Sequence, residues 1–422
     1  MAVGDVLPES FLLREDLATG APVERLTAPR ELCHGMRYTA RQVTRDGRFL
    51  IYSRERNGMR RICAMNLETG VSLQLTAGRD VADYTGVLSP DDRFLYYLQG
   101  DGVFRINLYS LMRESLYRSA RGWVPQTFTV SDDGRRVIVC ESTGRSVPSF
   151  LGRSDWEAFS LSGLAQPRSR VVRVDVATGE AAVVVEQEAW IGLAQERPGD
   201  PDTLLFCHEG SYEDIDARVW LVDSDGGRLR QGHPQPTGRV VSHEFWWPDG
   251  SLFGCYVSGV GDAPKAEIRG VDPGTGRVEV SVAVPPLVHC SLSRDGRTAV
   301  GDSRGSAVPV HEGAQEGPGS DDLLYLIDMA TGVCEPLCHH GSSWSLSYRT
   351  TQDCHPHPFV SDDGCWVFFT SDRDGKPAMF RVPVPGATTP SCGAPSTPLC
   401  DAERDPEWGL WATEGTGASR WK

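Results

Sequence analysis

The stretch VTRDGRFLIYSRERNGMRRICAMNLETGVSLQLT, residues 43–76, contains the unit that decides the fold. An Asp-Gly pair at Asp46 precedes one apolar run, an Asn-Gly pair at Asn57 precedes a second, and a Thr-Gly pair at Thr69 precedes a third. Asp-Gly and Asn-Gly pairs supply the positive φ angles that two-residue hairpin turns require, and the runs between them have the composition of strands. The stretch therefore predicts antiparallel strands joined by tight turns.

The same unit returns along the whole chain. Further copies cover residues 89–108, 130–185, 198–229, 247–282, 292–337 and 360–382, of which the copy at 198–229 is degenerate. Repeats at about forty- to fifty-residue spacing are typical of propeller blades, each a four-stranded sheet packed on its neighbours around a central axis. We therefore predict an all-β, seven-bladed β-propeller that forms a single domain over residues 1–422.

The two ends of the chain indicate how the ring closes. FLLREDLATGAPVERLT, residues 11–27, has the second half of a unit without the first, and a Pro- and Ser-rich stretch follows the last copy. We expect a strand from residues 1–30 to complete the last blade. Residues 144–168 and 303–321 interrupt blades and are expected to be surface loops, and residues 385–422 an irregular C-terminal extension.

Composition and charge exclude some classes of partner. The formal net charge of -15 disfavours nucleic acid and anionic membrane surfaces as partners. No run of eighteen apolar residues predicts a membrane-spanning helix, and the charged residues Glu9, Arg14 and Asp16 argue against a signal peptide. The twelve cysteines never form a CxxC pair and are expected to be reduced thiols in a cytoplasmic protein. The oligomeric state stays open.

Four of the ten histidines lie at one place in the repeat. His243, His289 and the pair His355 and His357 come just before the Asp-Gly turn of three consecutive units, on the strand that lines the central channel. Equivalent positions of neighbouring blades converge on the axis, and side chains at i and i+2 of a strand share a face. We expect these imidazoles to meet beside Gln352, which suits a divalent metal such as Mn, Fe, Ni, Co or Zn.

Alternatives exist for each of these residues and their neighbours. A single histidine is more often structural, so it is the shared register that favours a common ligand. The degenerate unit places His208, Glu209 and Arg218 at the same channel, where Arg218 either pairs with a carboxylate or is a solvated charge. HHGSSW, residues 339–344, is expected to form either part of the channel rim or a loop without function. GDSRG, residues 301–305, matches a nucleophile elbow but no helical pattern follows it.

Longer stretches of the chain resemble one known family. SHEFWWPDG at 242–250, FCHEGSYEDIDARVW at 206–220, HCSLSRDGRTAVGDS at 289–303, GSSW at 341–344 and QDCHPHPFVSDDGCWVFFTSDRDGKPAMF at 352–380 look like the bacterial oligogalacturonate lyases of polysaccharide lyase family 22. The resemblance covers nearly the whole chain. The Q-x-x-H-P-H segment with the two other histidine motifs is specific, whereas the repeats alone would indicate only a TolB-like propeller.

The resemblance implies a fold, a reaction and roles for individual residues. It implies a cytoplasmic seven-bladed propeller that cleaves short oligogalacturonides by β-elimination late in pectin breakdown. It further implies a manganese site of His289, Gln352, His355 and His357, with His243 as the Brønsted base and Arg218 in contact with the substrate. His208 is a further expected substrate contact.

Three differences from the family pattern bear on the substrate. The chain has Ser211-Tyr212 where the family usually has Pro-Trp, and Gly301-Asp302-Ser303 where it usually has Gly-Asp-Gly. The insertion at 303–321 is also atypical. The other functions compatible with the pattern are a lyase or epimerase that acts on a different uronate, and a non-catalytic propeller scaffold, which would have no reason to align histidines in three blades.

Overall fold

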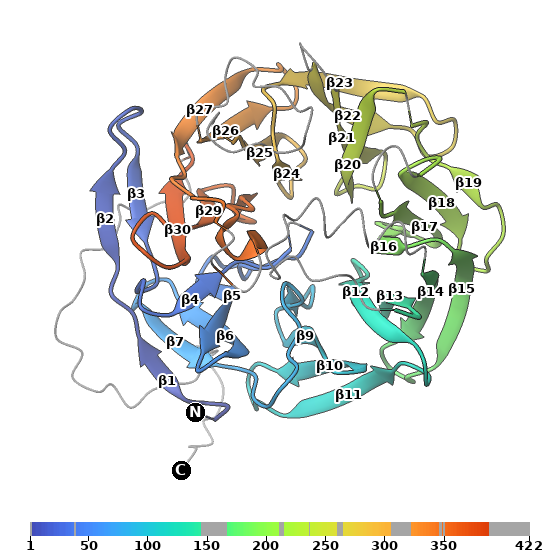
Figure 1. Ribbon diagram of the computed structural model, residues 1–422, viewed down its shortest axis with the longest axis horizontal. Coiled ribbons are helices and arrows are strands. Elements are labelled where there is room, and N and C mark those ends of the chain that lie inside the picture. Colours follow the sequence, from blue (N-terminus) through green and yellow to red (C-terminus); the bar gives the residue numbers. More distant parts are fainter. Residues whose placement is uncertain are drawn as a thin grey trace.

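Seven antiparallel sheets surround a central channel in the computed structural model (Figure 1). It describes residues 2–37, 39–144, 167–210, 215–235, 237–259, 265–304, 322–345, 348 and 351–387. Among these residues the helical elements are limited to η1, a single 3-10 turn at Thr351–Cys354. The predicted all-β, seven-bladed propeller is therefore confirmed. Most of the predicted loops at 144–168 and 303–321, and of the extension at 385–422, lies outside the described residues.

The first four blades follow the chain in order. Blade 1 contains β4 (Leu32–His34), β5 (Phe49–Arg56), β6 (Met59–Asn66), β7 (Val71–Gln74) and β1 (Val6–Pro8). Blade 2 contains β8 (Val87–Leu88), β9 (Phe94–Gln99), β10 (Gly102–Asn107) and β11 (Arg113–Arg118). Blade 3 contains β12 (Val124–Val130), β13 (Arg136–Ser142), β14 (Arg168–Asp175) and β15 (Ala181–Glu188). Blade 4 contains β16 (Ile191–Arg197), β17 (Asp200–His208), β18 (Val219–Asp223) and β19 (Arg230–Gln231).

The last three blades complete the ring. Blade 5 contains β20 (Arg239–Trp246), β21 (Phe253–Gly259), β22 (Ala266–Val271) and β23 (Val278–Val284). Blade 6 contains β24 (His289–Leu292), β25 (Thr298–Asp302), β26 (Leu323–Asp328) and β27 (Cys334–His339). Blade 7 contains β28 (Phe359–Val360), β29 (Trp366–Ser371), β30 (Ala378–Pro383), β3 (Pro22–Arg25) and β2 (Leu12–Glu15). In each blade the first strand of the repeat lies nearest the axis and is followed by a tight turn, which is an Asp-Gly turn in blades 1, 3, 5, 6 and 7.

The N-terminal segment closes the ring from both sides, as Figure 1 shows where β2 and β3 lie beside β30 and β1 lies beside β7. Strand β3 pairs with β30 in a register that places Glu24 opposite Arg381, and these two buried side chains form an ion pair with an N–O distance of 2.6 Å. The predicted closing strand is thus confirmed. The pairing of β1 with β7 was not expected from the repeats.

Neighbouring blades bury their faces against one another. Ile138 and Cys140 of blade 3 pack with Leu204 and Phe206 of blade 4, and all four are fully buried. Such contacts recur around the ring, so the apolar runs of the repeat form the interfaces between blades rather than one central core. The axis is left for polar side chains, which is where the histidines lie.

The turns at one end of the channel share one arrangement in blades 2, 3, 6 and 7. In blade 3, Ser131 Oγ donates to Asp133 Oδ1 at 2.7 Å, Arg135 N donates to the same oxygen at 3.0 Å, and Gly134 has a φ of 70°. The same hydroxyl to carboxylate bond occurs at Ser89, Ser293 and Ser361. This end of each inner strand is fixed by local hydrogen bonds.

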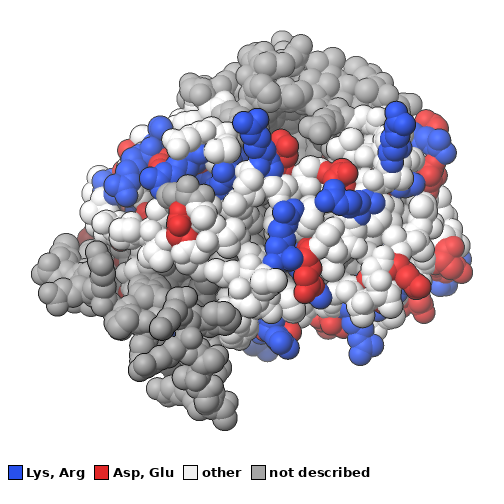
Figure 2. Space-filling view, turned by 90° about the horizontal axis from the view of Figure 1, so that it is seen from below, with Lys and Arg blue, Asp and Glu red and all other residues white. Residues whose placement is uncertain are grey.

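The charged surface and the cysteines complete the description. Acidic and basic side chains are both present across the face shown in Figure 2. No helix in the described part of the chain is long and apolar enough to cross a membrane. Nine cysteines in the described part of the chain are free thiols.

Candidate active site

Three of the predicted metal ligands converge at the channel end opposite the Asp-Gly turns. His289 begins β24, while His355 and His357 lie between η1 and β28. One ring nitrogen of each lies within 4.8 Å of the others. The centroids of the His289 and His357 rings are 3.9 Å apart, and those of His355 and His357 are 5.8 Å apart. The predicted convergence of these three imidazoles is confirmed.

The backbone reaches this arrangement in an unexpected way. The prediction assumed an extended chain at 355–357, but η1 precedes the segment and His357 has a φ of 43°. His243, Tyr84 and Trp344, which surround the cluster, also have positive φ angles of 56°, 60° and 55°. Non-glycine residues seldom adopt this conformation, and such strain is characteristic of functional sites.

Asp302 supports His289 from the neighbouring strand of the same blade. Residues 289 and 302 face each other across the β24–β25 pair, and the fully buried Asp302 carboxylate accepts bonds from His289 Nδ1 at 2.8 Å and His289 N at 2.6 Å. A carboxylate bound to one ring nitrogen fixes the tautomer and leaves the other nitrogen for a metal. Asp302 was noted in the sequence only as part of a motif; its support of His289 depends on strand register.

The remaining donors also fit a metal ion. Gln352 Oε1 lies 2.7 Å from His357 Nε2, so the amide oxygen adjoins the imidazole cluster as predicted. The buried His357 Nδ1 has no hydrogen-bond partner among the described residues, as expected of a nitrogen whose lone pair is reserved for a metal. Burial, followed by the neighbouring His289, lowers the pKa of His355 and His357 well below the usual range. Neutral imidazoles are the metal-binding form.

A buried ion pair between blades 1 and 7 holds η1 in place. Asp353, adjacent to Gln352, accepts from Arg60 NH2 with both carboxylate oxygens at 2.7 Å, and both residues are buried. Arg60 Nε also lies 2.9 Å from Asp83 Oδ1. His34 stacks on Tyr84 with a centroid separation of 4.3 Å beside this pair. The contact joins residues 293 positions apart, which is why the repeat pattern did not reveal it.

Trp344 forms the wall of the cluster on the blade 6 side. Its ring lies 4.4 Å from that of His355 and is nearly parallel to that of His289 at 6.1 Å. The Arg304 guanidinium lies over the indole, 4.9 Å from the ring centroid. His340 is fully buried and bonds to Ser303 O and Ser342 N. The segment at 339–344 was expected to form either part of the channel rim or a loop without function. The ring contacts place its Trp344 beside the imidazole cluster.

His243 lies next to the cluster but outside it. The centroid of its ring is 5.4 Å from that of His289, and its Nδ1 is 3.0 Å from Ser242 Oγ. A register shift in the β20–β21 pair between Ser242 and Phe245 turns the side chain towards the axis. Burial, followed by His289 and Arg218, lowers the pKa of His243 well below the usual range, which favours the neutral imidazole.

Arg218 is a buried, paired cation. Its Nε lies 2.6 Å from Glu244 Oε1, its NH2 3.5 Å from Glu244 Oε2 and its NH1 2.8 Å from Glu209 Oε2. The bidentate pairing considered from the sequence is therefore present, and the solvated alternative is excluded. Three of the five N–H groups are used in this way, which leaves two that have no partner among the described residues.

His208 lies at a distance from the imidazole cluster. It ends β17, its Nε2 is 2.8 Å from Gln187 Oε1, and its ring is 4.8 Å from that of Trp220. These partners belong to the outer part of blades 3 and 4. Its predicted role as a substrate contact stays a prediction.

Comparison with known proteins accounts for this combination of fold and site. The sequence pattern of the oligogalacturonate lyase family matches residues 1–388. The chain belongs to the oligogalacturonate lyase family. It is 33% identical over 387 residues to the oligogalacturonide lyase of Pectobacterium atrosepticum and to the oligogalacturonate lyase of Dickeya dadantii, covering 91% of this chain and 99% of each relative.

Solved oligogalacturonate lyases have the same architecture. A structure described as oligogalacturonate lyase in complex with manganese has a TM-score of 0.82 and 32% identity, covering 92% of this chain and 99% of the other. The enzyme from Vibrio parahaemolyticus has a TM-score of 0.82 and 30% identity, covering 91% and 99%. The resemblance inferred from the histidine motifs is confirmed, and members of this family are lyases.

Proposed function

We propose that this chain is a metal-dependent oligogalacturonate lyase that cleaves digalacturonate and trigalacturonate by β-elimination to give 4,5-unsaturated uronate products in pectin breakdown. In this reaction the C5 proton, which lies α to the C6 carboxylate, is removed and the 4-O-linked sugar is expelled. We further propose that it acts in the cytoplasm, since nine described cysteines are free thiols.

The proposed metal ligands are His289, His355, His357 and Gln352. A bound Mn²⁺, or another divalent transition metal, supplies a Lewis acid for the substrate carboxylate, whose charge otherwise makes the C5 proton very weakly acidic. Asp302 keeps the His289 ring in the ligating tautomer through its 2.8 Å bond to Nδ1. The Arg60–Asp353 pair holds the segment that carries the other three donors.

The proposed base is His243. Its ring adjoins the cluster, with a centroid 5.4 Å from that of His289, so a substrate held at the cluster presents its C5 proton towards an imidazole that is not a ligand. Arg218, fixed by Glu244 and Glu209, has two N–H groups left to orient the reacting uronate. Elimination then moves the C5–H electron pair into a C4–C5 double bond as the C4–O4 bond breaks.

One observation carries the proposal. Imidazoles from blades 6 and 7 bring ring nitrogens within 4.8 Å of one another beside a fourth imidazole from blade 5, in a chain of the oligogalacturonate lyase family. A scaffold propeller has no need to bring three histidine rings into contact at its axis. The cost of burying such polar rings together is offset when a ligand satisfies them.

The test follows the ultraviolet absorbance of the conjugated unsaturated uronate after Mn-loaded protein is mixed with digalacturonate. We expect a rise that a chelator suppresses and added Mn²⁺ restores, and mass spectrometry should identify an unsaturated product. Metal binding without a rise would contradict the pectin reaction and direct the search to other uronates. A change of sugar configuration without cleavage would identify an epimerase. Absence of metal binding would favour a non-catalytic scaffold.

A further inference from the structure

The loop after β4 presents Arg37 to the channel. Met36 N donates to Gln42 Oε1 at 2.6 Å, and Ala40 N donates to Arg37 O at 2.8 Å, so the backbone at Arg37 is held by Ala40 and its neighbour Met36 by the buried Gln42 side chain. The backbone that carries the half-buried Arg37 is thus fixed, which lowers the entropic cost of binding a ligand.

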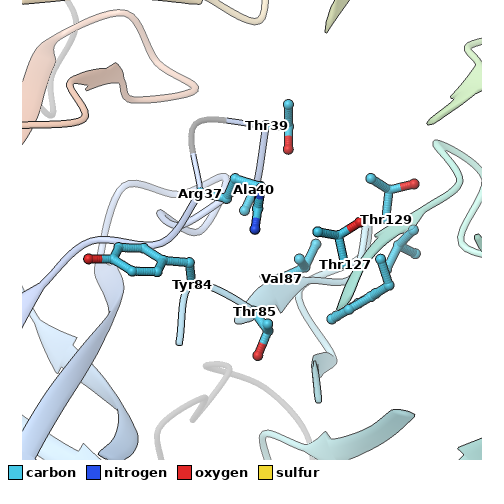
Figure 3. A pocket seen from close by; sticks show the side chains of 10 residues that line it. Arg37, Thr39, Ala40, Tyr84, Thr85, Val87, Thr127 and Thr129 are labelled. Carbon is cyan, nitrogen blue, oxygen red and sulfur yellow. The ribbon is translucent and has the colours of Figure 1, made fainter. Parts of the chain in front are cut away.

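Arg37 lies in a cavity with groups that can bind a sugar acid. The cavity has a volume of about 50 Å³ and includes Tyr84, Thr85, Thr127 and Thr129 in its lining. Figure 3 shows Arg37 between Tyr84 on one side and Thr127 and Thr129 on the other. A guanidinium is a donor for a carboxylate. The Thr85 and Thr129 hydroxyls donate to Ala82 O at 3.0 Å and Ala194 O at 2.7 Å, which holds the cavity wall in place.

Two other arginines at the channel are neutralised by the protein. Arg218 pairs with Glu244 and Glu209, and Arg60 pairs with Asp353 and Asp83. Among the described residues, by contrast, the Arg37 guanidinium has no carboxylate within ion-pair distance. A cation that faces a cavity without a protein anion is available to an anionic ligand.

The cavity adjoins the imidazole cluster through one aromatic ring. Tyr84 lines the cavity, and its ring centroid is 5.8 Å from that of His357. A sugar held at the cluster therefore has its neighbour in the chain within reach of the Arg37 cavity. The hydroxyl of Tyr84 lies 3.4 Å from Asp353 Oδ1, so the ring is anchored to the segment that bears the proposed ligands.

We propose that Arg37 binds the carboxylate of the second uronate, the residue next to the one that loses its C5 proton, and so selects uronate oligosaccharides over neutral ones. The inference rests on the proposed function. Thr39, which also lines the cavity, carries a hydroxyl that adds a hydrogen bond to the same sugar.

The test compares wild-type protein with Arg37→Met and Arg37→Lys. Calorimetry on metal-free protein measures digalacturonate affinity without turnover, and we expect Arg37→Met to weaken it by about 10- to 100-fold, the value of a charged hydrogen-bonded pair. With metal, kcat/KM should fall by the same factor, mostly through KM. Arg37→Lys should retain part of the affinity. Arg297→Met, at an exposed arginine of the Asp295-Gly296 turn at the opposite end of the channel, is the matched control.

A digalacturonate methyl-esterified only at the second uronate gives an independent measurement on wild-type protein. We expect wild-type kcat/KM to fall by about 10- to 100-fold with the ester, and Arg37→Met to treat acid and ester alike. The inference is overturned if Arg37→Met binds digalacturonate as tightly as the wild type, or if it discriminates between acid and ester as the wild type does. If Arg37→Met loses its fold, the inference is tested by the wild-type comparison of acid and ester and by the affinity of Arg37→Lys. Absence of turnover by metal-loaded wild type instead overturns the proposed function.

Discussion

The two ends of the central channel are held in place by different kinds of contact. At the Asp-Gly end, the turns repeat one local arrangement, in which a serine or threonine hydroxyl and a backbone N–H bind one aspartate, as at Ser131 and Asp133. At the histidine end, His243 and His357 have positive φ angles, and Arg60 crosses from blade 1 to Asp353 of η1. The regular end is fixed by neighbours in sequence and the irregular end by contacts between distant segments, so the two should respond differently to substitution.

The largest effect is expected for the ion pair between Arg60 of blade 1 and Asp353 of η1. Arg60→Met leaves the Asp353 carboxylate buried without its main partner, and we expect the free energy of unfolding to fall by about 3–5 kcal/mol. Manganese affinity, measured by calorimetry, should fall as well because η1 is released. The double variant Arg60→Met/Asp353→Asn should regain stability but not affinity. Full affinity in Arg60→Met would show that η1 needs no such support.

The next effect concerns the support of His289. Asp302→Asn keeps the shape of the side chain but removes the negative charge that fixes the ring, and we expect manganese affinity to fall by about 10- to 100-fold. Thermal unfolding of the metal-free variant, followed by circular dichroism, checks that the fold is intact. Wild-type affinity in this variant would mean that the strand register alone orients His289.

A smaller effect on acid stability is expected from His208, away from both ends. Burial lowers its pKa to about 4 from 6.5, against the opposing effect of Asp216. Because the unfolded chain binds this proton more readily, stability present above about pH 6.5 is lost as the pH falls towards 4, with a slope of up to about 1.4 kcal/mol per pH unit. In urea titrations His208→Gln should show a shallower decline. Equal slopes would refute this account.

The smallest effect is expected at the regular end. Asp133→Ala removes the acceptor of two turn hydrogen bonds and the half-exposed carboxylate that pairs with Arg136, and we expect a loss of about 1 kcal/mol in denaturant unfolding. Manganese affinity and turnover should not change, since the other turns hold their own strands. A loss of manganese binding in Asp133→Ala would contradict the conclusion that the two ends are stabilised independently.

The same contrast explains what could be predicted from the sequence. The seven blades and the convergence of His289, His355 and His357 follow from repeat spacing and register, both of which are local patterns. The supports at Asp302 and Asp353 depend on which strands and segments meet across the fold, and no spacing encodes that. His208 illustrates the converse, because its unit was assigned to the channel while its partners, such as Gln187, lie in the outer part of the blades.

Separating metal from base tests the central claim most directly. Manganese affinity by calorimetry and elimination by ultraviolet absorbance would be measured on His243→Ala and His357→Ala side by side. The account predicts that His243→Ala binds manganese like the wild type but no longer forms the unsaturated product, whereas His357→Ala loses both properties. Loss of manganese binding in His243→Ala, or product formation at the wild-type rate, would contradict the account.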